Sequence, residues 1–245
     1  MKLATFVVTP LLALAAFIGA ASPAQATTTG SGKVVTESRA VSGFEAIAVS
    51  GAIKLEVRQT GKEALAISAD DNILPLIETV VESTTRGQTL VIRGKRGESF
   101  RTRNDIKVVV DVAQLTGLSA AGSGDVMVGK LNTPKLALSL SGSNNARLSE
   151  LATDAFEVRI AGSGDVRAGG SAKALKLAIA GSGNADLAGV AADDVSVSIA
   201  GSGDASVTAN KALSASIAGS GDVVYQGNPP ALKTSVAGSG RVSKR

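Results

Sequence analysis

The feature that most restricts the fold of this chain is a Gly-Ser-Gly triplet that recurs through its second half. Triplets begin at Gly122, Gly162, Gly181, Gly201, Gly219 and Gly238, and a Gly-Ser-Asn variant begins at Gly142. With the variant included, successive starts lie 18 to 20 residues apart. A repeat of this length is typical of a solenoid, in which each repeat forms one coil and contacts only its neighbours.

Apolar residues alternate with polar ones on both sides of each triplet. Two residues before the first glycine lie Ala120, Leu140, Ile160, Ile179, Ile199, Ile217 and Val236. Four residues after it lie Val126, Ala146, Val166, Ala185, Ala205, Val223 and Val242. Period-two alternation indicates strands with one buried face, and repeats stacked at about 4.8 Å would share one core. We therefore expect an all-β fold, a right-handed parallel β-helix or solenoid of about seven coils of about 20 residues each.

The triplets themselves are expected to form the corners between two strands. A chain that turns within three residues needs backbone angles that side-chain-bearing residues rarely adopt, and glycine supplies them. Asn best tolerates left-handed geometry after Gly, which would explain the variant triplet. The predicted structural corner residues are Gly122, Gly124, Gly142, Asn144, Gly162, Gly164, Gly181, Gly183, Gly201, Gly203, Gly219, Gly221, Gly238 and Gly240.

A column of polar residues follows the triplets directly: Asp125, Asn145, Asp165, Asn184, Asp204, Asp222 and Arg241. One interpretation is a calcium ladder, because Gly-x-Gly-x-Asp repeats in other solenoids bind that ion. The longer period and the neutral Asn residues disfavour it. We expect instead that these side chains accept hydrogen bonds from corner amides, with no metal and no cofactor.

The first 26 residues have the features of a secretory signal peptide. Met1-Lys2 gives a positive start, residues 3–21 are nearly all apolar, and Ala24-Gln25-Ala26 fits a cleavage site. An uncleaved anchor is the alternative, which Pro10 and Gly19 disfavour. No transmembrane segment is expected in the mature chain, which would be periplasmic, at the cell surface or extracellular. The expected divisions are a signal peptide (1–26), a flexible segment (27–32), a β-rich cap (33–114) and the repeat solenoid (115–245).

The cap region contains strand patterns that do not repeat. Apolar residues alternate on both sides of Ser50-Gly51, which suggests paired strands. Residues 72–77 suggest one helical turn, capped by Asn72 and with Pro75 near its start. We expect this region to pack onto the solenoid and close its first coil, because a solenoid needs protected ends.

Composition excludes several kinds of chemistry. The chain has no Cys and no His, so disulfides and imidazole-dependent catalysis are excluded. After cleavage only Phe44, Phe100, Phe156 and Tyr225 would remain as aromatic residues, too few for typical stacking surfaces. The net charge of +4, or +3 without Lys2, is too small to indicate nucleic-acid binding.

Two groups of charged residues are candidate sites. Adjacent acid pairs at residues 70–71 and 193–194 fall in expected turns, where their side chains need not converge, so we expect no enzyme. A basic cluster is either a solvated loop or a contact for anionic lipid or polysaccharide. Its members are Arg86, Arg93, Lys95, Arg96, Arg101 and Arg103.

Several segments together resemble a known bacterial family. They are FEAIAVSGAIKLEV (44–57), ISADDNILPLIETVVES (67–83), LVI (90–92) and the repeated AGSGD. The family is labelled putative auto-transporter adhesin, head GIN domain. The resemblance spans nearly the whole mature chain and implies an exported β-helical domain with an adhesive role.

Three functional hypotheses follow. The first is an adhesin or cell-envelope binding module that presents a flat, Ser/Ala/Lys-rich strand face to an unknown protein or glycan. The second is a periplasmic structural or envelope-maintenance protein without a surface ligand. The third, less favoured, is a fibre subunit that assembles through stacked repeats.

Overall fold

The computed structural model describes residues 27–245, and the predicted signal peptide, residues 1–26, lies outside the described part. That part is nearly all-β, with one short 3-10 turn. No helix within it has the length and apolar character needed to cross a bilayer. The elements are β1 (Thr27–Thr29), β2 (Val34–Arg39), β3 (Ala46–Gly51), β4 (Ile53–Gln59), β5 (Ala64–Asp70), η1 (Leu74–Leu76), β6 (Ile77–Thr84), β7 (Gly87–Gly94), β8 (Ser99–Arg101), β9 (Ile106–Val112), β10 (Gly117–Gly122), β11 (Asp125–Gly142), β12 (Asn145–Gly162), β13 (Val166–Gly181), β14 (Ala185–Gly201), β15 (Ala205–Gly219), β16 (Val223–Gln226), β17 (Ala231–Gly238) and β18 (Val242–Lys244).

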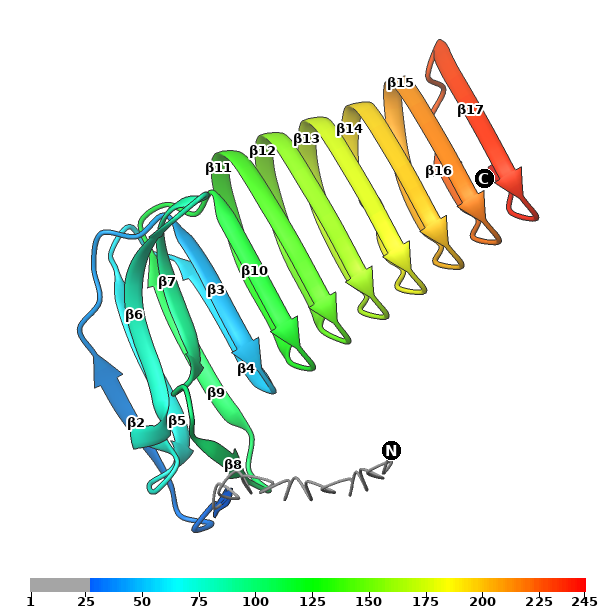
Figure 1. The fold of residues 1–245 in the computed structure, drawn as a ribbon. Helices are drawn as coiled ribbons and strands as arrows, with labels where there is room; N and C mark the ends of the chain where they lie inside the picture. Colours follow the sequence, from blue (N-terminus) through cyan, green and yellow to red (C-terminus); the bar gives the residue numbers. More distant parts are fainter. Residues whose placement is uncertain (1–26) are drawn as a thin grey trace, which may run out of the picture.

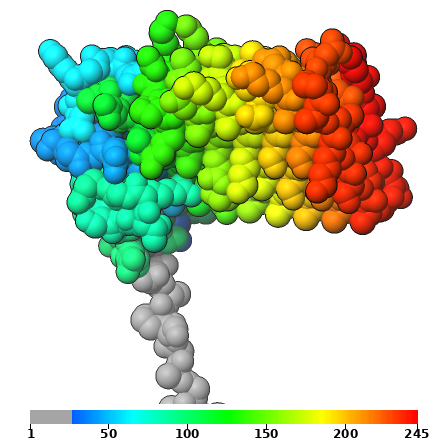
Figure 2. Space-filling view, turned by 90° about the horizontal axis from the view of Figure 1, so that it is seen from above, coloured from blue at the N-terminus to red at the C-terminus, as the bar shows by residue number. Residues whose placement is uncertain are grey.

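Strands β10 to β18 wind into a parallel β-solenoid, as the repeats predict (Figure 1). Each long strand from β11 to β15 follows most of one coil and pairs in parallel with the next. We call the run that leads into each corner face A, the run that leaves it face B, and the connection to the next coil face C. Corner glycines stack in register, since Gly122 pairs with Gly142 and Gly142 with Gly162. In the space-filling view of Figure 2 the coils form adjacent bands of colour.

The interior is filled by the apolar rows that the alternation predicts. One row on face A consists of side chains that are at most 3% exposed: Leu136, Phe156, Leu175, Val195 and Leu213. Burial of each large apolar side chain contributes about 1.5–3 kcal/mol to stability. Because the coils are in register, equivalent side chains contact one another along the whole solenoid.

Face C adds apolar side chains to the core that the sequence reasoning missed. Leu131, Leu151 and Val190 are at most 1% exposed, and they lie in the segments that connect one repeat to the next. Leu131 pairs with Leu151, so the connection is itself part of the parallel ladder. The core is therefore enclosed on three sides.

The stack continues into the cap region, where the sequence suggested no repeat. β3 and β4 flank Gly51, which pairs in register with Gly122. β3 lies between β10 and β7, and β4 lies between β11 and β9. The coil of residues 46–59 is thus inserted between the coil of residues 87–112 and the first Gly-Ser-Gly coil. The predicted β-solenoid is confirmed, with about six turns where about seven coils were expected.

Antiparallel strands cover the outer end of this stack. β5 pairs with β9, β2 pairs with β5, and β6 pairs with β7, all antiparallel. The first parallel coil therefore does not present a bare edge at this end. Such covering is one way in which proteins avoid edge-to-edge aggregation.

Two local features of the cap differ from expectation. The segment predicted to be flexible, residues 27–32, contains β1, which pairs in parallel with β8. The expected helical turn is η1, with Pro75 in its first positions, but no side chain caps it. Asn72 instead accepts a hydrogen bond from the amide of Ser31 and donates one to the carbonyl of Thr29. Its role is to attach the N-terminal segment rather than to start a helix.

Candidate functional site

The first glycine of each triplet has a left-handed backbone. The φ angle is +126° at Gly162, where a residue with a Cβ would be strained. A Cβ at this position would also lie 2.4 Å from the carbonyl oxygen of Gly142. Backbone conformation and close packing therefore both require glycine here.

The second glycine of the triplet is needed only because the backbone of the adjacent corner lies so close to it. A Cβ on Gly164 would lie 2.1 Å from the carbonyl oxygen of Asn144, and one on Gly203 would lie 2.1 Å from that of Gly183. Neither residue has a left-handed backbone. At these glycine corners the backbones approach so closely that no side chain fits between them. The corner that carries Asn144 at this position is different.

The structure corrects the explanation for Asn144. No residue other than glycine has a positive φ in the described part of the chain, so Asn144 is not left-handed. Its side chain is 1% exposed, and its Oδ1 accepts a hydrogen bond from the Gly124 amide at 2.9 Å. Its Nδ2 donates to the carbonyls of Ser141 and Ala120, at 2.7 and 3.3 Å. Asn occupies this corner because it satisfies three buried backbone groups.

The Asp/Asn column joins successive corners by hydrogen bonds. The Asn184 amide donates to Asp165 Oδ1 at 3.0 Å, and the Asp204 amide donates to Asn184 Oδ1 at 3.0 Å. The same contact continues to Asp222 and Arg241, at 2.8 and 2.9 Å. This is the amide-accepting role expected of the column, and it is seen from Asp165 onward. Asp125 accepts instead from the side chain of Asn145, at 3.2 Å. Within residues 27–245, no three His, Cys, Asp or Glu side chains are grouped so as to hold a metal ion.

The six cations of the predicted anion contact do not form one cluster in the structure. Arg93 is held by Glu78 and Glu82 of β6, at 2.9 and 2.8 Å, and the bond to Glu78 is the main reason that the pKa of Arg93 is raised. Arg86 lies in the turn between β6 and β7 and reaches over face A, where it donates to the hydroxyls of Ser119 and Ser139. Both guanidinium groups are therefore engaged within the protein.

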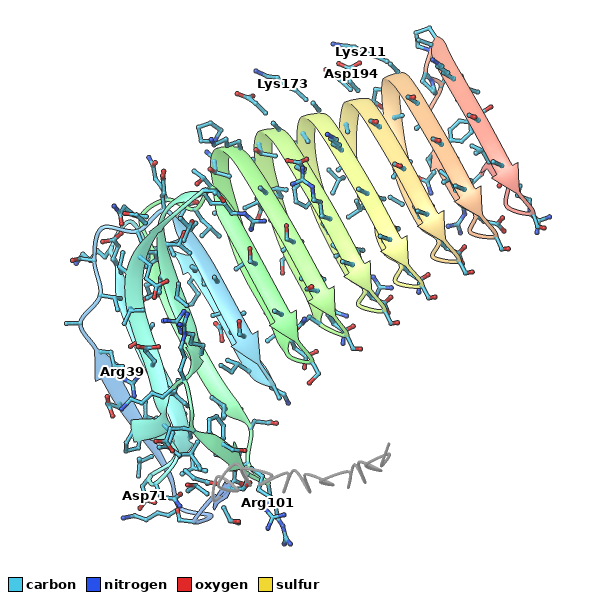
Figure 3. The ribbon with its side chains drawn as sticks, viewed as in Figure 1. Arg39, Asp71, Arg101, Lys173, Asp194 and Lys211 are labelled. Carbon is cyan, nitrogen blue, oxygen red and sulfur yellow. The ribbon has the colours of Figure 1, made fainter. Side chains whose placement is uncertain are left out.

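The remaining four cations are exposed around β8 and are named here the basic tip: Lys95, Arg96, Arg101 and Arg103. Figure 3 shows Arg101 at the outer end of the cap, on the same end as Asp71 and away from the repeats. β8 is paired with β1, so Arg101 lies on paired backbone, whereas Lys95, Arg96 and Arg103 lie in the segments on either side of β8.

Two carboxylates attach this end to the rest of the cap. Asp70 is 1% exposed and accepts hydrogen bonds from Thr102 Oγ1 and Asn104 Nδ2, both at 2.6 Å. These two hydrogen bonds hold the pKa of Asp70 below its ordinary value, and the bond from Thr102 has the larger effect. Asp71 accepts a hydrogen bond from the Ser31 hydroxyl at 2.6 Å, which likewise lowers its pKa. The two carboxylates bind different partners and do not form a convergent pair.

A groove of about 980 Å³ crosses face B. It extends over β9, β4, β11, β12, β13 and β14, and its walls are rows of charged and amide side chains. The sequence showed which residues are exposed on these strands. It did not show that β9 and β4 adjoin β11, so the groove could not be predicted.

A second groove, of about 800 Å³, follows the edge where face C turns into face A. Its floor includes Ala155, Ala174 and Ala212. Figure 3 shows Lys173 and Lys211 along this edge, on the opposite side of the solenoid from the Gly-Ser-Gly corners. Both lysines form ion pairs across neighbouring coils, at 2.8 and 2.9 Å.

Comparisons with known proteins agree with this architecture. A crystal structure of a putative adhesin from Bacteroides fragilis is 27% identical, with a TM-score of 0.81 over 89% of this chain and 99% of that one. A putative adhesin from Parabacteroides merdae is 26% identical, with a TM-score of 0.72 over 89% and 99%. A putative lipid binding protein from Parabacteroides distasonis is 25% identical, with a TM-score of 0.72 over 90% and 100%.

No match to this chain is found among curated protein sequences. The family model described as putative auto-transporter adhesin, head GIN domain, matches residues 43–229, which include the inserted coil and most of the repeats. The resemblance noted in the sequence is thereby confirmed, and the chain belongs to the putative auto-transporter adhesin, head GIN domain family.

Proposed function

We propose that this protein is an exported, non-catalytic binding module of the cell envelope that acts as an adhesin. The family description and the names of two similar solved structures support this role. Its partner would be a protein or glycan of the envelope or of a surface outside it.

The structural observation that carries the proposal is the outer surface of face A. One exposed row on it consists of small side chains on adjacent parallel strands: Ala161, Ala180, Ala200, Ala218 and Ala237. The strands beneath are fixed by continuous ladders. Short side chains on a fixed backbone lose little conformational entropy when a partner binds, which favours recognition by a broad surface.

The basic tip supports a more specific contact, with anionic groups of the envelope. Four exposed cations on one end provide attraction to phosphate or carboxylate groups, at about 1 kcal/mol for each cation near an anionic membrane. The lipid-binding name of the Parabacteroides distasonis structure is in line with such a contact. The tip would then hold one end of the molecule near the envelope while the solenoid extends from it.

Protease shaving of intact host cells tests the surface role, with a periplasmic protein as the internal control. Digestion of this protein while the control survives is the expected result. Full protection, followed by release on osmotic shock, would contradict a surface adhesin. It would favour the alternative of a periplasmic envelope-maintenance protein without a surface ligand.

Sedimentation with lipid vesicles tests the basic tip. The mature protein is expected to bind phosphatidylglycerol vesicles more strongly than phosphatidylcholine vesicles, and reversal of the four tip cations to Glu should abolish the difference. The matched control reverses four exposed lysines of the solenoid, Lys130, Lys173, Lys176 and Lys233. Equal loss of binding in both variants would show a general charge effect and reject the tip as the contact.

A further inference from the structure

The groove on face B is built from two parallel rows of exposed side chains, with one member of each row on every strand. The row nearer the corners runs Lys107, Lys54, Asp125, Asn145, Asp165 and Asn184. The second row runs Val109, Glu56, Met127, Arg147, Arg167 and Asp186. A ligand lying along the solenoid axis would therefore meet a new pair of side chains about every 4.8 Å.

The charges of this groove nearly cancel. Its cations are Lys54, Lys107, Arg147 and Arg167, and its acids are Glu56, Asp105, Asp125, Asp165 and Asp186. Two ion pairs lie within it, Lys54 with Asp105 at 2.8 Å and Arg167 with Asp186 at 3.0 Å. Any strongly charged polymer, of either sign, would meet repulsive groups along this path.

Two exposed side chains in the middle of the groove are available to a ligand. Met127 is 55% exposed, although most large apolar side chains of the described part are buried. Arg147 is exposed on the neighbouring strand, next in the same row, and forms no ion pair with any residue between 27 and 245. Together they offer an apolar contact beside a planar group with five N–H donors.

These features match one class of ligand. A neutral glycan presents hydroxyl groups that both donate and accept hydrogen bonds, and an apolar C–H face on each ring. Carboxylate and amide oxygens would accept from its hydroxyls, Arg147 would donate to them, and Met127 would contact a ring face. Because the strands lie about 4.8 Å apart, an extended glycan along the solenoid axis would present successive sugars to successive strands.

We propose that the groove on face B binds an extended, uncharged glycan along the solenoid axis, with Met127 and Arg147 at its centre. This inference rests on the proposed role as a binding module and names the ligand class of one surface. The absence of aromatic residues from the lining implies weak binding at each site, because ring stacking contributes nothing. A high overall affinity would then require several copies of the protein to bind one polymer.

The test measures binding of the purified mature protein to immobilised dextran, laminarin and mannan, which are uncharged polysaccharides. Binding to at least one of them is expected, with similar affinity at about 0.05 M and about 0.5 M salt, because no net charge is neutralised. The variants Arg147→Ala and Met127→Ala should each weaken binding about tenfold, which corresponds to about 1.4 kcal/mol. Thermal unfolding of each variant checks that the fold is retained.

Lys130→Ala is the matched control, because Lys130 is an exposed cation of β11, the strand that carries Met127, and it lies outside both the groove and face A. Its affinity should equal that of the unmodified protein. No binding to any of the three polymers would overturn the proposal, as would equal weakening by Lys130→Ala. Preference for polygalacturonate or poly-glutamate with strong salt dependence would also overturn it. Surface digestion of intact cells is unaffected by these outcomes, so failure of the glycan site and failure of the surface role can be told apart.

Discussion

The side-chain oxygen of Asn144 accepts a hydrogen bond from the backbone amide of Gly124, 2.9 Å away across adjacent coils. Asn144→Ala would remove the side-chain partner of this buried amide, and the side-chain donor to the carbonyls of Ser141 and Ala120. Each unsatisfied buried group costs about 1–3 kcal/mol. We expect the variant to lose at least that much unfolding free energy, measured by denaturant titration.

The adjacent Asn145 is exposed and provides the control. Asn145→Ala should change the unfolding free energy by no more than about 0.5 kcal/mol. Equal effects of the two substitutions would contradict the role given to the inward-facing side chain of Asn144.

Gly164, the second glycine of its corner, should tolerate no side chain. In Gly164→Ala the new Cβ would lie 2.1 Å from a backbone oxygen that cannot rotate away. Overpacking of this kind costs about 1–3 kcal/mol or more. In Gly129→Ala the nearest atom would be 3.8 Å away, so this control should be neutral or stabilising by up to about 1 kcal/mol. A harmless Gly164→Ala, seen as an unchanged melting temperature, would refute the close-approach argument.

Truncation of an apolar residue in the core row should reduce the unfolding free energy by an amount that depends on where its coil lies in the solenoid. Phe156 and Leu232 occupy the same row of face A, but Phe156 is 1% exposed and Leu232 is 51% exposed. Phe156→Ala should cost about 3–5 kcal/mol, because it leaves a cavity among fixed neighbours. Leu232→Ala should cost about 0.5 kcal/mol. Similar losses for both, by chemical denaturation, would show that the row is not packed as described.

Acid should weaken the attachment of the basic tip through Asp70. The pKa of Asp70 is lowered from 3.8 in the folded protein, so its ionised form stabilises the fold above that pH. This stability is lost as pH falls through the folded pKa. The difference in unfolding free energy between the unmodified protein and Asp70→Asn should therefore be largest above about pH 4 and shrink below it.

Thr102→Val checks the cause of that shift, because it removes the first of the two hydrogen-bond donors to Asp70. This variant should partly reduce the pH dependence of the unfolding free energy. Parallel pH profiles for the unmodified protein and Asp70→Asn would rule out this carboxylate as the source.

Sequence periodicity was sufficient to predict the repeats and their core. Side chains such as Leu140, Ile160 and Ile179 recur at a fixed distance from each corner, and all three are buried. The reason is physical, because a coil in register with its neighbours must place equivalent residues at equivalent depth. Amide-accepting Asp and Asn residues were predictable for the same reason, since their position relative to the corner is constant.

Features that depend on which coils are neighbours in space could not be predicted from the periodicity. Nothing in the alternation around Gly51 indicates that this corner stacks on Gly122, which is 71 residues later and follows a different local sequence. The face B groove depends on that stacking, because Lys54 and Lys107 reach it only through β4 and β9. Arg86 was assigned to the basic cluster by proximity in sequence, whereas its hairpin turn directs it onto Ser119 and Ser139.

The inserted coil of residues 46–59 has a consequence for how the protein acquires its structure. Both of its neighbours lie later in the chain, in β7–β9 and in β10–β11. Synthesis delivers the N-terminus first, so both edges of this coil stay unpaired until residues 87–112 have emerged, and its second edge stays unpaired until residues beyond 122 have emerged. Closure of those long loops makes the first step slow and cooperative. Every later coil is laid directly on a finished one, so growth from β11 onward needs only local contacts, and the cap serves as the template that starts it.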